Sequence, residues 1–431
     1  MLDRIFSLEK FFFVTSLMVI LMISHFSFSS KILVFYSVIL SLRLIFIFKK
    51  SPPVIILLIF ISLYISPFFS HFFQGYEVSV WKSFNNSYYL NQVLSIFSIF
   101  ICSIFVFTKK CTHYTPIIKR LNITPSNSIF YASIIIGFFL AHFGLKGESL
   151  LSGLNYALID KQRSPLFEYT LIFFLTAFIH SKRNKTQYLF LFALSLFVIL
   201  KDFLYGGRVT SLMLILLIYL INYEYRIKTK YLFVFMILAL FLLSLISFIR
   251  SAPLIFLEGK YDFNLFYEYY FSVNQNTTLN SNEGDVAHSS ARILGMIETN
   301  IITTMDRFKS FLYFAISVFT PGISISELSN LAAYKKDMYQ GGGGLLFPIS
   351  FYTWMSYPGV ILSGFFVSRM IKSFIETKRN ALIVYLLLFF STFPRWFSYS
   401  PIIVFKLCFY GLLVYVFFNS LKKMKKVEHC N

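Results

Sequence analysis

Four arginines lie where apolar segments of this chain end on the same side of a predicted membrane. Arg163, Arg208, Arg250 and Arg395 all fall at or near the outer ends of predicted spans, at the depth of lipid head groups. Arginine suits phosphate at this depth, because its planar guanidinium binds two oxygens at once and stays protonated. Membrane proteins usually keep this side poor in basic residues. Four arginines at one level therefore predict a binding site for an anionic lipid head group.

Arg208 has the most specific context of the four. Gly206 and Gly207 let the main chain approach a ligand closely, and Arg208 opens the next predicted helix. The free N–H groups at a helix N-terminus attract anions as well. The alternative is that Arg208 only extends to the membrane interface while the two glycines make a tight turn.

A second group of candidate residues lies in a long polar insertion over residues 250–347. His288 is its only histidine and Arg292 follows four residues later, so a helix places both on one face. Histidine titrates near neutral pH and can take a proton from a sugar hydroxyl, which makes His288 the candidate general base. Arg292 and Arg307 can reach farther out than the four arginines above. The alternatives are an exposed polar loop residue at position 288, or a base among the acids of the insertion: Glu283, Asp285, Glu298 and Asp306.

Metal, cofactor and nucleic-acid chemistry find little support in the sequence. The predicted external segments contain no His/Cys cluster and no Asp-x-Asp pair, so we expect a metal-independent reaction without a cofactor. The net charge of +20 comes from small basic clusters between apolar segments, a pattern that orients membrane proteins and does not indicate nucleic acid. The four cysteines lie in spans or on predicted cytoplasmic segments, so no disulfide is expected.

Apolar helices must position these residues. Hydrophobic residues make up 57% of the 431, charged residues only 13%, and runs that can cross a ~30 Å hydrocarbon core recur along the chain. We expect an all-α polytopic membrane protein with about 12 transmembrane helices and both termini in the cytoplasm. Residues 1–249 hold nine spans, residues 250–347 form an extracytoplasmic loop with short helices, and residues 348–431 hold three spans and a tail. The predicted spans are approximately residues 11–29, 32–48, 54–73, 90–107, 128–144, 166–180, 188–204, 209–222, 231–249, 348–368, 381–393 and 402–419.

Two short helices are predicted within the insertion. Ser289 and Ser290 can cap a helix that runs through Arg292 to about Asn300. Asp306 can cap another, over residues 308–319, which is apolar on most sides and is expected on the membrane surface or over the spans. The glycine tract at residues 341–344 predicts flexible or closely approached main chain just before the next span.

These features together resemble the Wzy-type O-antigen or oligosaccharide repeat-unit polymerases. The resemblance rests on the Gly206-Gly207-Arg208 turn, the long late external loop, the glycine tract before an aromatic span and the final Arg395 turn. It covers about the second half of the chain. An Arg-x10-Gly spacing described for some members is absent, and no acidic residue follows the glycine tract.

The resemblance implies a GT-C-like fold and a glycosyltransferase at the outer face of the bacterial cytoplasmic (inner) membrane. The growing glycan on undecaprenyl pyrophosphate passes to a sugar hydroxyl of the next lipid-linked repeat unit, forming O-antigen or capsule-type polysaccharide. Donor and acceptor are then the expected partners in the lipid bilayer, with a chain-length regulator and a flippase as further ones.

In this expectation two residues are catalytic and five arginines bind pyrophosphate and glycan. His288 and Arg208 carry the catalytic roles, and binding falls to Arg163, Arg208, Arg250, Arg292 and Arg395. Three alternatives stay open. One is an O-antigen ligase that hands the glycan to lipid A core, another is a flippase that moves lipid-linked oligosaccharides without chemistry, and the third is a structural or sensory membrane protein.

Overall fold

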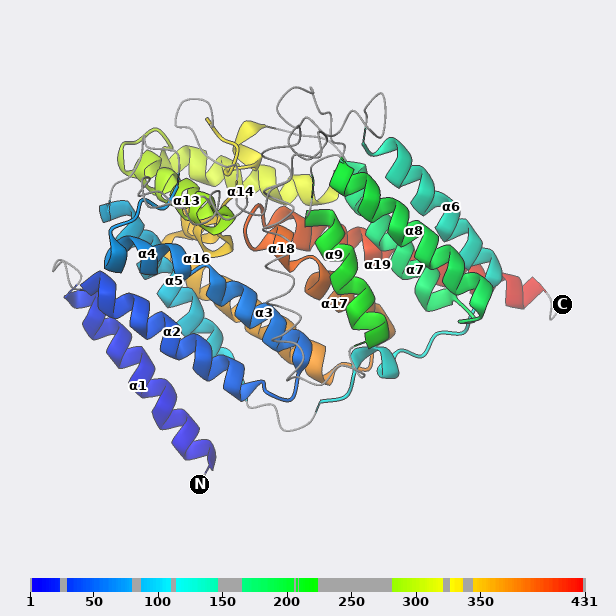
Figure 1. The fold of residues 1–431 in the computed structure, drawn as a ribbon, viewed down its shortest axis with the longest axis horizontal. Helices are drawn as coiled ribbons and strands as arrows, with labels where there is room; N and C mark the ends of the chain where they lie inside the picture. The colour runs from blue at the N-terminus through cyan, green and yellow to red at the C-terminus, as the bar shows by residue number, and fades with distance from the viewer. Residues whose placement is uncertain are drawn as a thin grey trace, which may run out of the picture. The chain divides into compact units, whose positions relative to one another are not determined.

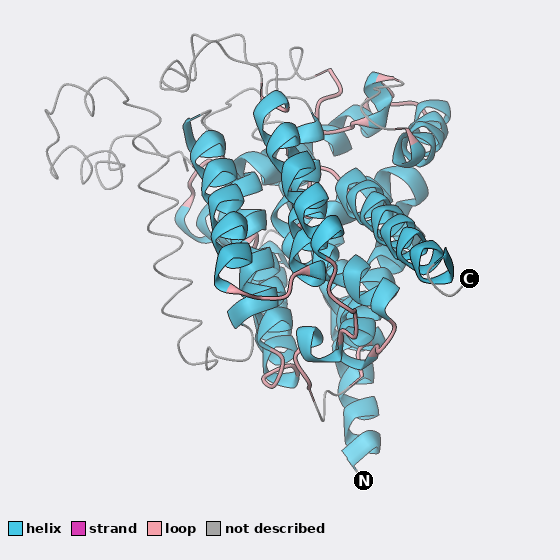
Figure 2. Cartoon of the chain, turned by 90° about the vertical axis from the view of Figure 1, so that its right-hand side faces the viewer, coloured by secondary structure: helices cyan, strands magenta, loops and turns pink. Residues whose placement is uncertain are grey.

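The computed structural model describes residues 2–23, 29–79, 87–109, 114–145, 165–204, 207, 209–223, 281–320, 326–335 and 344–428 of the chain. Most of these residues are helical, and none of them forms a β-strand (Figures 1 and 2). Three predicted site residues, Arg163, Arg208 and Arg250, lie outside the described residues, as does the predicted span 231–249.

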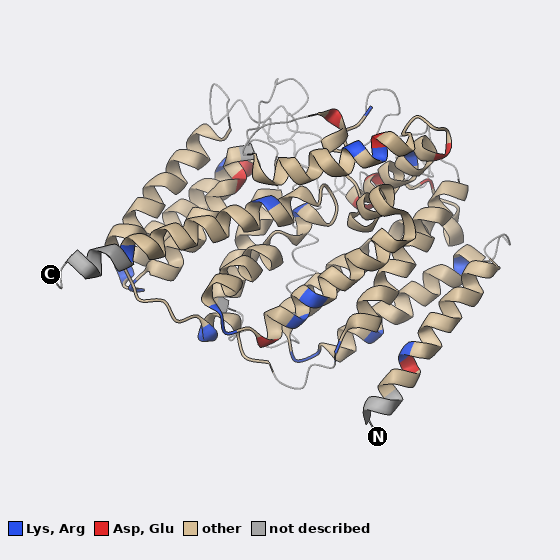
Figure 3. Ribbon diagram, turned by 180° about the vertical axis from the view of Figure 1, so that it is seen from behind, with Lys and Arg blue, Asp and Glu red and all other residues tan. Residues whose placement is uncertain are grey.

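Helices occupy the other predicted spans. Their bounds are α1 (Leu2–Met22), α2 (Ser29–Ile47), α3 (Pro52–Leu63), α4 (Ser66–Gln74), α5 (Ser87–Phe107), α6 (Asn127–Phe143), α7 (Thr170–His180), α8 (Lys185–Leu204), α9 (Val209–Ile218), α16 (Phe347–Glu376), α17 (Asn380–Ser391) and α19 (Ile402–Glu428). Six segments of the described chain are long and apolar enough to cross a membrane, with α3 and α4 counted as one. Few positions along the helices are Lys, Arg, Asp or Glu, so most of the ribbon is tan (Figure 3). The described helices are thus consistent with a polytopic membrane protein, whereas the total of about 12 spans stays a prediction.

The chain forms two compact units, and each unit combines three segments that are separate in the sequence. Unit 1 consists of Met1–Tyr114, Asn274–Glu376 and Arg395–Ile402, and unit 2 of Thr115–Val273, Thr377–Pro394 and Ile403–Asn431. In unit 2, α6, α7 and α8 pack together, and α17 packs on α9. The insertion helices belong to unit 1, and the first of them packs on α4 and α5 from the first part of the chain.

Unit 1 is built around α5, which contacts α1, α2, α13 (Asn282–Glu298) and α16. Phe97, Phe100 and Phe105 are completely buried, as expected for a helix covered on several sides. At Gly364 of α16, an added Cβ would come within 2.5 Å of the Ser103 Cβ. Small residues at this crossing therefore let α5 and α16 pack closely, as is common between membrane helices.

The first insertion helix begins earlier than expected. Helix α13 starts at Asn282, and its N-cap is Ser281, whose hydroxyl accepts a hydrogen bond from the Gly284 main-chain N–H at 3.0 Å. The prediction that Ser289 and Ser290 cap this helix is wrong, since both lie inside it. Gly284 is required here because an added Cβ would meet the Val78 carbonyl oxygen at 1.9 Å.

The second insertion helix, α14 (Thr304–Phe319), is capped by two residues acting together. Thr303 is the N-cap, and the Asp306 carboxylate accepts from the Thr303 main-chain N–H at 3.1 Å while the Asp306 main-chain N–H binds the Thr303 hydroxyl. Asp306 therefore caps the helix from its third position, as part of a capping box. Helix α14 packs on the first part of α16, where Phe314 and Trp354 have ring centroids 4.4 Å apart.

Helix α16 is broken inside the predicted span 348–368. Ser356 has φ 55° and ψ −147°, a conformation that residues with a Cβ rarely adopt, and Pro358 follows two residues later. Proline has no main-chain N–H, so carbonyl groups in the preceding turn lose their helical partners. Helix α16 is among the segments apolar enough to cross a membrane, as predicted, but apolar composition does not reveal the break inside it.

Candidate functional site

The candidate site is a stripe of polar side chains on one face of α13. Asp285, His288, Ser289 and Arg292 are spaced three and four residues apart, so they follow one another along the same side of the helix. Ser289 and Arg292 are fully buried, His288 is 1% exposed, and Asp285 is half-buried. The helix packs on α5, α4 and α16. A buried polar stripe is unusual because burial penalises polar groups that lack partners.

Arg292 is the most unusual member of the stripe. Its Nη2 donates to the Ala332 carbonyl oxygen at 2.9 Å, while Nε and Nη1 have no hydrogen-bond partner among the described residues. Burial lowers the pKa of the Arg292 guanidinium below its ordinary value. No acidic side chain in the described part of the chain forms an ion pair with it. The site therefore holds a buried cation with N–H groups left to donate, an arrangement that suits an anionic ligand.

His288 lies one turn before Arg292, which confirms that the two share one face. Its burial contradicts the alternative of an exposed loop residue at this position. The neighbouring Ser289 hydroxyl has no hydrogen-bond partner in the described structure. A histidine, a serine and an arginine thus lie together on the face of α13 that the rest of unit 1 covers.

Asp285 is the acidic member of the stripe. Its Oδ1 accepts a hydrogen bond from the Ser79 hydroxyl at 2.5 Å. Burial raises the pKa of the Asp285 carboxyl, the Ser79 hydrogen bond opposes this shift, and nearby Glu283 adds to it. By contrast, hydrogen bonds from Thr303 lower the pKa of the exposed Asp306 carboxyl. Of these two candidate bases, Asp285 is therefore the stronger, whereas Asp306 is occupied in the cap of α14.

The segment that follows the glycine tract ties α13 to the final turn of the chain. The Leu346 main-chain N–H donates to the Ser290 hydroxyl at 3.2 Å, and the Leu345 N–H donates to the Ser398 carbonyl oxygen at 2.9 Å. At Gly344, an added Cβ would lie 2.6 Å from both the Ser398 oxygen and the Val286 side chain. The expected close main-chain approach is confirmed at this glycine; residues 341–343 lie outside the described residues.

Arg395 reaches the start of α13 through an aromatic ring. It lies on the short helix α18 (Phe393–Trp396), with its guanidinium 5.0 Å from the centroid of the Tyr399 ring. The Tyr399 hydroxyl donates to the Asn282 side-chain oxygen at 2.9 Å. Asn282 precedes Arg292 by ten residues, or about 15 Å along the helix. The structure thus places Arg395 in the same unit as the stripe, at the opposite end of α13 from Arg292.

The position of Arg307 in the insertion suggested that its side chain reaches outward, but in the structure the side chain contacts α16 instead. Its Nε donates to the Thr353 carbonyl oxygen at 2.5 Å, and its Nη2 donates to the Tyr352 oxygen at 3.2 Å and the Ser356 hydroxyl at 2.7 Å. These groups surround the break in α16, so Arg307 pairs main-chain oxygens that the break leaves free. Pro358 inside an apolar segment was the one sequence signal for this role.

In the turn before Arg208, Gly207 lies within the described residues, whereas Gly206 does not. The Gly207 N–H donates to the Asp202 carbonyl oxygen at 2.8 Å, and an added Cβ would meet the Asp202 carboxylate at 2.2 Å. The same carboxylate accepts hydrogen bonds from the main-chain N–H and hydroxyl of Ser211, at 2.9 and 3.0 Å. Close packing against Asp202 therefore requires glycine at position 207, whether or not a ligand binds there.

Comparisons with known proteins leave the family open. No protein-family model, no curated protein and no solved structure matches this chain. Within the described residues, no group of three or more His, Cys, Asp and Glu side chains could hold a metal ion.

Proposed function

We propose that this protein is a glycosyltransferase that polymerises undecaprenyl-pyrophosphate-linked repeat units into O-antigen or capsule-type polysaccharide. The reaction would take place at the outer face of the bacterial cytoplasmic membrane, within a GT-C-like arrangement of helices. One observation carries the proposal: the buried and incompletely paired guanidinium of Arg292, on the helix that also bears His288 and Asp285.

The chemistry of the transfer calls for these side chains. The acceptor hydroxyl gives its proton to His288 or Asp285, and its oxygen attacks the anomeric carbon of the donor sugar. The bond from that carbon to the pyrophosphate breaks, and undecaprenyl pyrophosphate leaves with the electron pair. A fixed cation away from water stabilises this developing charge strongly. Arg292 and Arg395 would supply positive charge in unit 1, and pyrophosphate binding by Arg163, Arg208 and Arg250 stays a prediction from the sequence.

The burial of the stripe sets a condition on this mechanism. His288 is 1% exposed, and Arg292 is held by the carbonyl of Ala332. A sugar hydroxyl can reach His288 only when a segment packed against α13 moves away, and residues 326–335 and 344–346, which contact Arg292 and Ser290, are proposed to do so. Movement of a covering segment during turnover is common in enzymes that exclude water from the reaction.

Deletion of the gene followed by gel analysis of surface polysaccharide tests the proposal. Loss of a polymerase leaves single repeat units on the core, whereas loss of a flippase or of a ligase leaves none. The deletion strain is then complemented with Arg292→Ala and, as a matched control, Arg369→Ala, an exposed arginine of α16. We expect single-unit product from the first variant and normal polymer from the second, at equal protein abundance. Normal polymer from Arg292→Ala would contradict the proposed site.

A further inference from the structure

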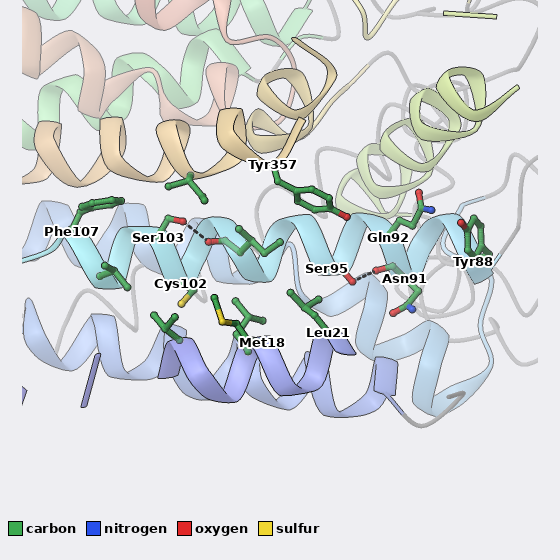
Figure 4. Close-up of a pocket in the computed structure, with 15 residues that line it drawn as sticks. Met18, Leu21, Tyr88, Asn91, Gln92, Ser95, Cys102, Ser103, Phe107 and Tyr357 are labelled. Carbon is green, nitrogen blue, oxygen red and sulfur yellow. Dashed lines mark hydrogen bonds between the residues drawn. The ribbon is translucent and has the colours of Figure 1, made fainter. Parts of the chain in front are cut away.

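A long groove runs along α5 in unit 1, between α1 and α16 (Figure 4). Its volume is about 780 Å³. One stripe of α5 side chains at helical spacing lines it from Tyr88 to Phe107, which corresponds to about 28 Å of helix. This length is close to the ~30 Å thickness of a hydrocarbon core. The groove therefore extends over nearly the whole thickness of a hydrocarbon core, which is more than the depth of one leaflet.

The polarity of the lining changes along this length. At one end, the first two turns of α5 contribute Tyr88, Asn91 and Gln92, and Tyr357 of α16 lies across from them (Figure 4). Beyond these turns the α5 lining is mainly apolar. Ser103, which also lines this part, donates its hydroxyl to the Ile99 carbonyl of its own helix at 2.7 Å. The groove thus has a polar end and an apolar remainder, as a site for an amphiphile requires.

Helix α1 supplies the apolar wall opposite α5. Leu17, Met18 and Leu21 line the groove from this side. The Lys10 ammonium donates to the Val106 and Thr108 carbonyl oxygens, each at 2.7 Å. These bonds hold α1 against the C-terminal end of α5, so α1 is attached to α5 at the apolar end of the groove.

The side chains at the polar end can form hydrogen bonds but carry no charge. Asn91 accepts from the Ser30 hydroxyl through Oδ1 at 2.9 Å, which leaves its NH₂ group as a donor. Tyr88 and Tyr357 are about half exposed, and Gln92 is partly exposed. Among the described residues that line the groove, none is Lys, Arg, Asp or Glu. Amides and phenols of this kind match hydroxyl groups, whereas a phosphate would find no cation in this lining.

The shape and lining favour a hydrocarbon chain. The groove follows α5 for about 28 Å, and beyond the first two turns its lining is mainly apolar. A hydrocarbon chain is thin, flexible and apolar, so it can follow such a groove and contact the lining along its length. The volume is sufficient for at least one chain.

We propose that this groove binds one hydrocarbon chain of a glycolipid whose head group is an uncharged sugar. The chain lies along α5, and the sugar is bound by Tyr88, Asn91, Gln92 and Tyr357. The inference does not rest on the proposed function, since a pyrophosphate lipid carries charge at the position where the described residues of the lining carry none.

Native mass spectrometry of the full-length protein tests the proposal. The probes are monoglucosyl diacylglycerol and phosphatidylglycerol with identical acyl chains, mixed in equal amounts. We expect one glucolipid retained in preference to the phospholipid. Ile361→Trp fills the groove at a half-exposed position and should abolish this retention. Ile39→Trp, at a lipid-facing position of α2 that is 54% exposed, is the control and should keep it.

The sugar end is tested separately with Gln92→Leu, which keeps the size of the side chain and removes its hydrogen bonds. We expect the preference for the glucolipid to fall about fivefold, the effect of one hydrogen bond. Equal glucolipid retention by wild type and Ile361→Trp would overturn the groove as the site. Phosphatidylglycerol retained as well as the glucolipid, or an unchanged preference in Gln92→Leu, would overturn the sugar head group.

Discussion

Replacing Arg292 by methionine separates a binding role from a structural one. Methionine is similar in length, apolar and flexible, so it can fill the same space. Two guanidinium nitrogens are buried without partners among the described residues, at roughly 1–3 kcal/mol each, and removing them stabilises the fold by about 2–6 kcal/mol. The Ala332 carbonyl loses its hydrogen bond, which costs about 1–3 kcal/mol. The balance favours Arg292→Met by roughly 1–3 kcal/mol.

The expected result is a variant that is more stable and inactive. At about 2–4 °C per kcal/mol for a unit of this size, the Tm of the purified protein in detergent should rise by roughly 2–12 °C. Surface polymer should fall to single repeat units, because loss of one cation from a charged leaving group lowers the rate about a hundredfold. Arg369→Met, at an exposed position, should change neither quantity. A Tm lowered by several degrees in Arg292→Met would refute the reasoning and make Arg292 a structural residue.

Four further predictions concern other residues. Arg307→Ala should lower the free energy of unfolding by roughly 3 kcal/mol, and with it the Tm, because the Tyr352 and Thr353 carbonyls at the break in α16 lose a charged donor. Arg307→Lys should restore part of this loss. An unchanged Tm for Arg307→Ala would contradict this role. The raised pKa of Asp285 stabilises the fold below the ordinary pKa of the carboxyl, and this contribution is lost as pH rises through the raised value. The Tm of Asp285→Asn relative to wild type should therefore be higher at pH 7 than at pH 4, and an equal difference at both would count against it. Arg208→Lys should lose most polymer at normal abundance if Arg208 binds pyrophosphate through two N–H groups, and full activity would make it an interface anchor. Reporter fusions after Lys185 and Lys230 should indicate cytoplasm, and a fusion near Asn280 should indicate the outside; a cytoplasmic signal at Asn280 would overturn the predicted topology.

Local sequence signals were sufficient for much of the helical framework. Apolar runs predicted where helices form, because hydropathy is a property of neighbouring residues. The four-residue spacing of His288 and Arg292 predicted their shared face, and Asp306 takes part in a helix cap as expected. Gly344 marks a close main-chain approach, as its tract suggested. Each of these features depends on residues that lie near one another along the chain.

Long-range contacts decided the features that matter for the site. The partner of Arg292 is the Ala332 carbonyl, 40 residues away, and the partners of Arg307 are carbonyls at the break in α16. The same residue type thus lies in two settings. The Arg307 guanidinium donates to carbonyls at the break in α16, whereas the Arg292 guanidinium is buried with two nitrogens that have no partner among the described residues. Pro358 signals the break in α16, but the sequence does not show which arginine lies at it or which one is buried, because burial and pairing depend on which distant segments the tertiary fold brings against each side chain.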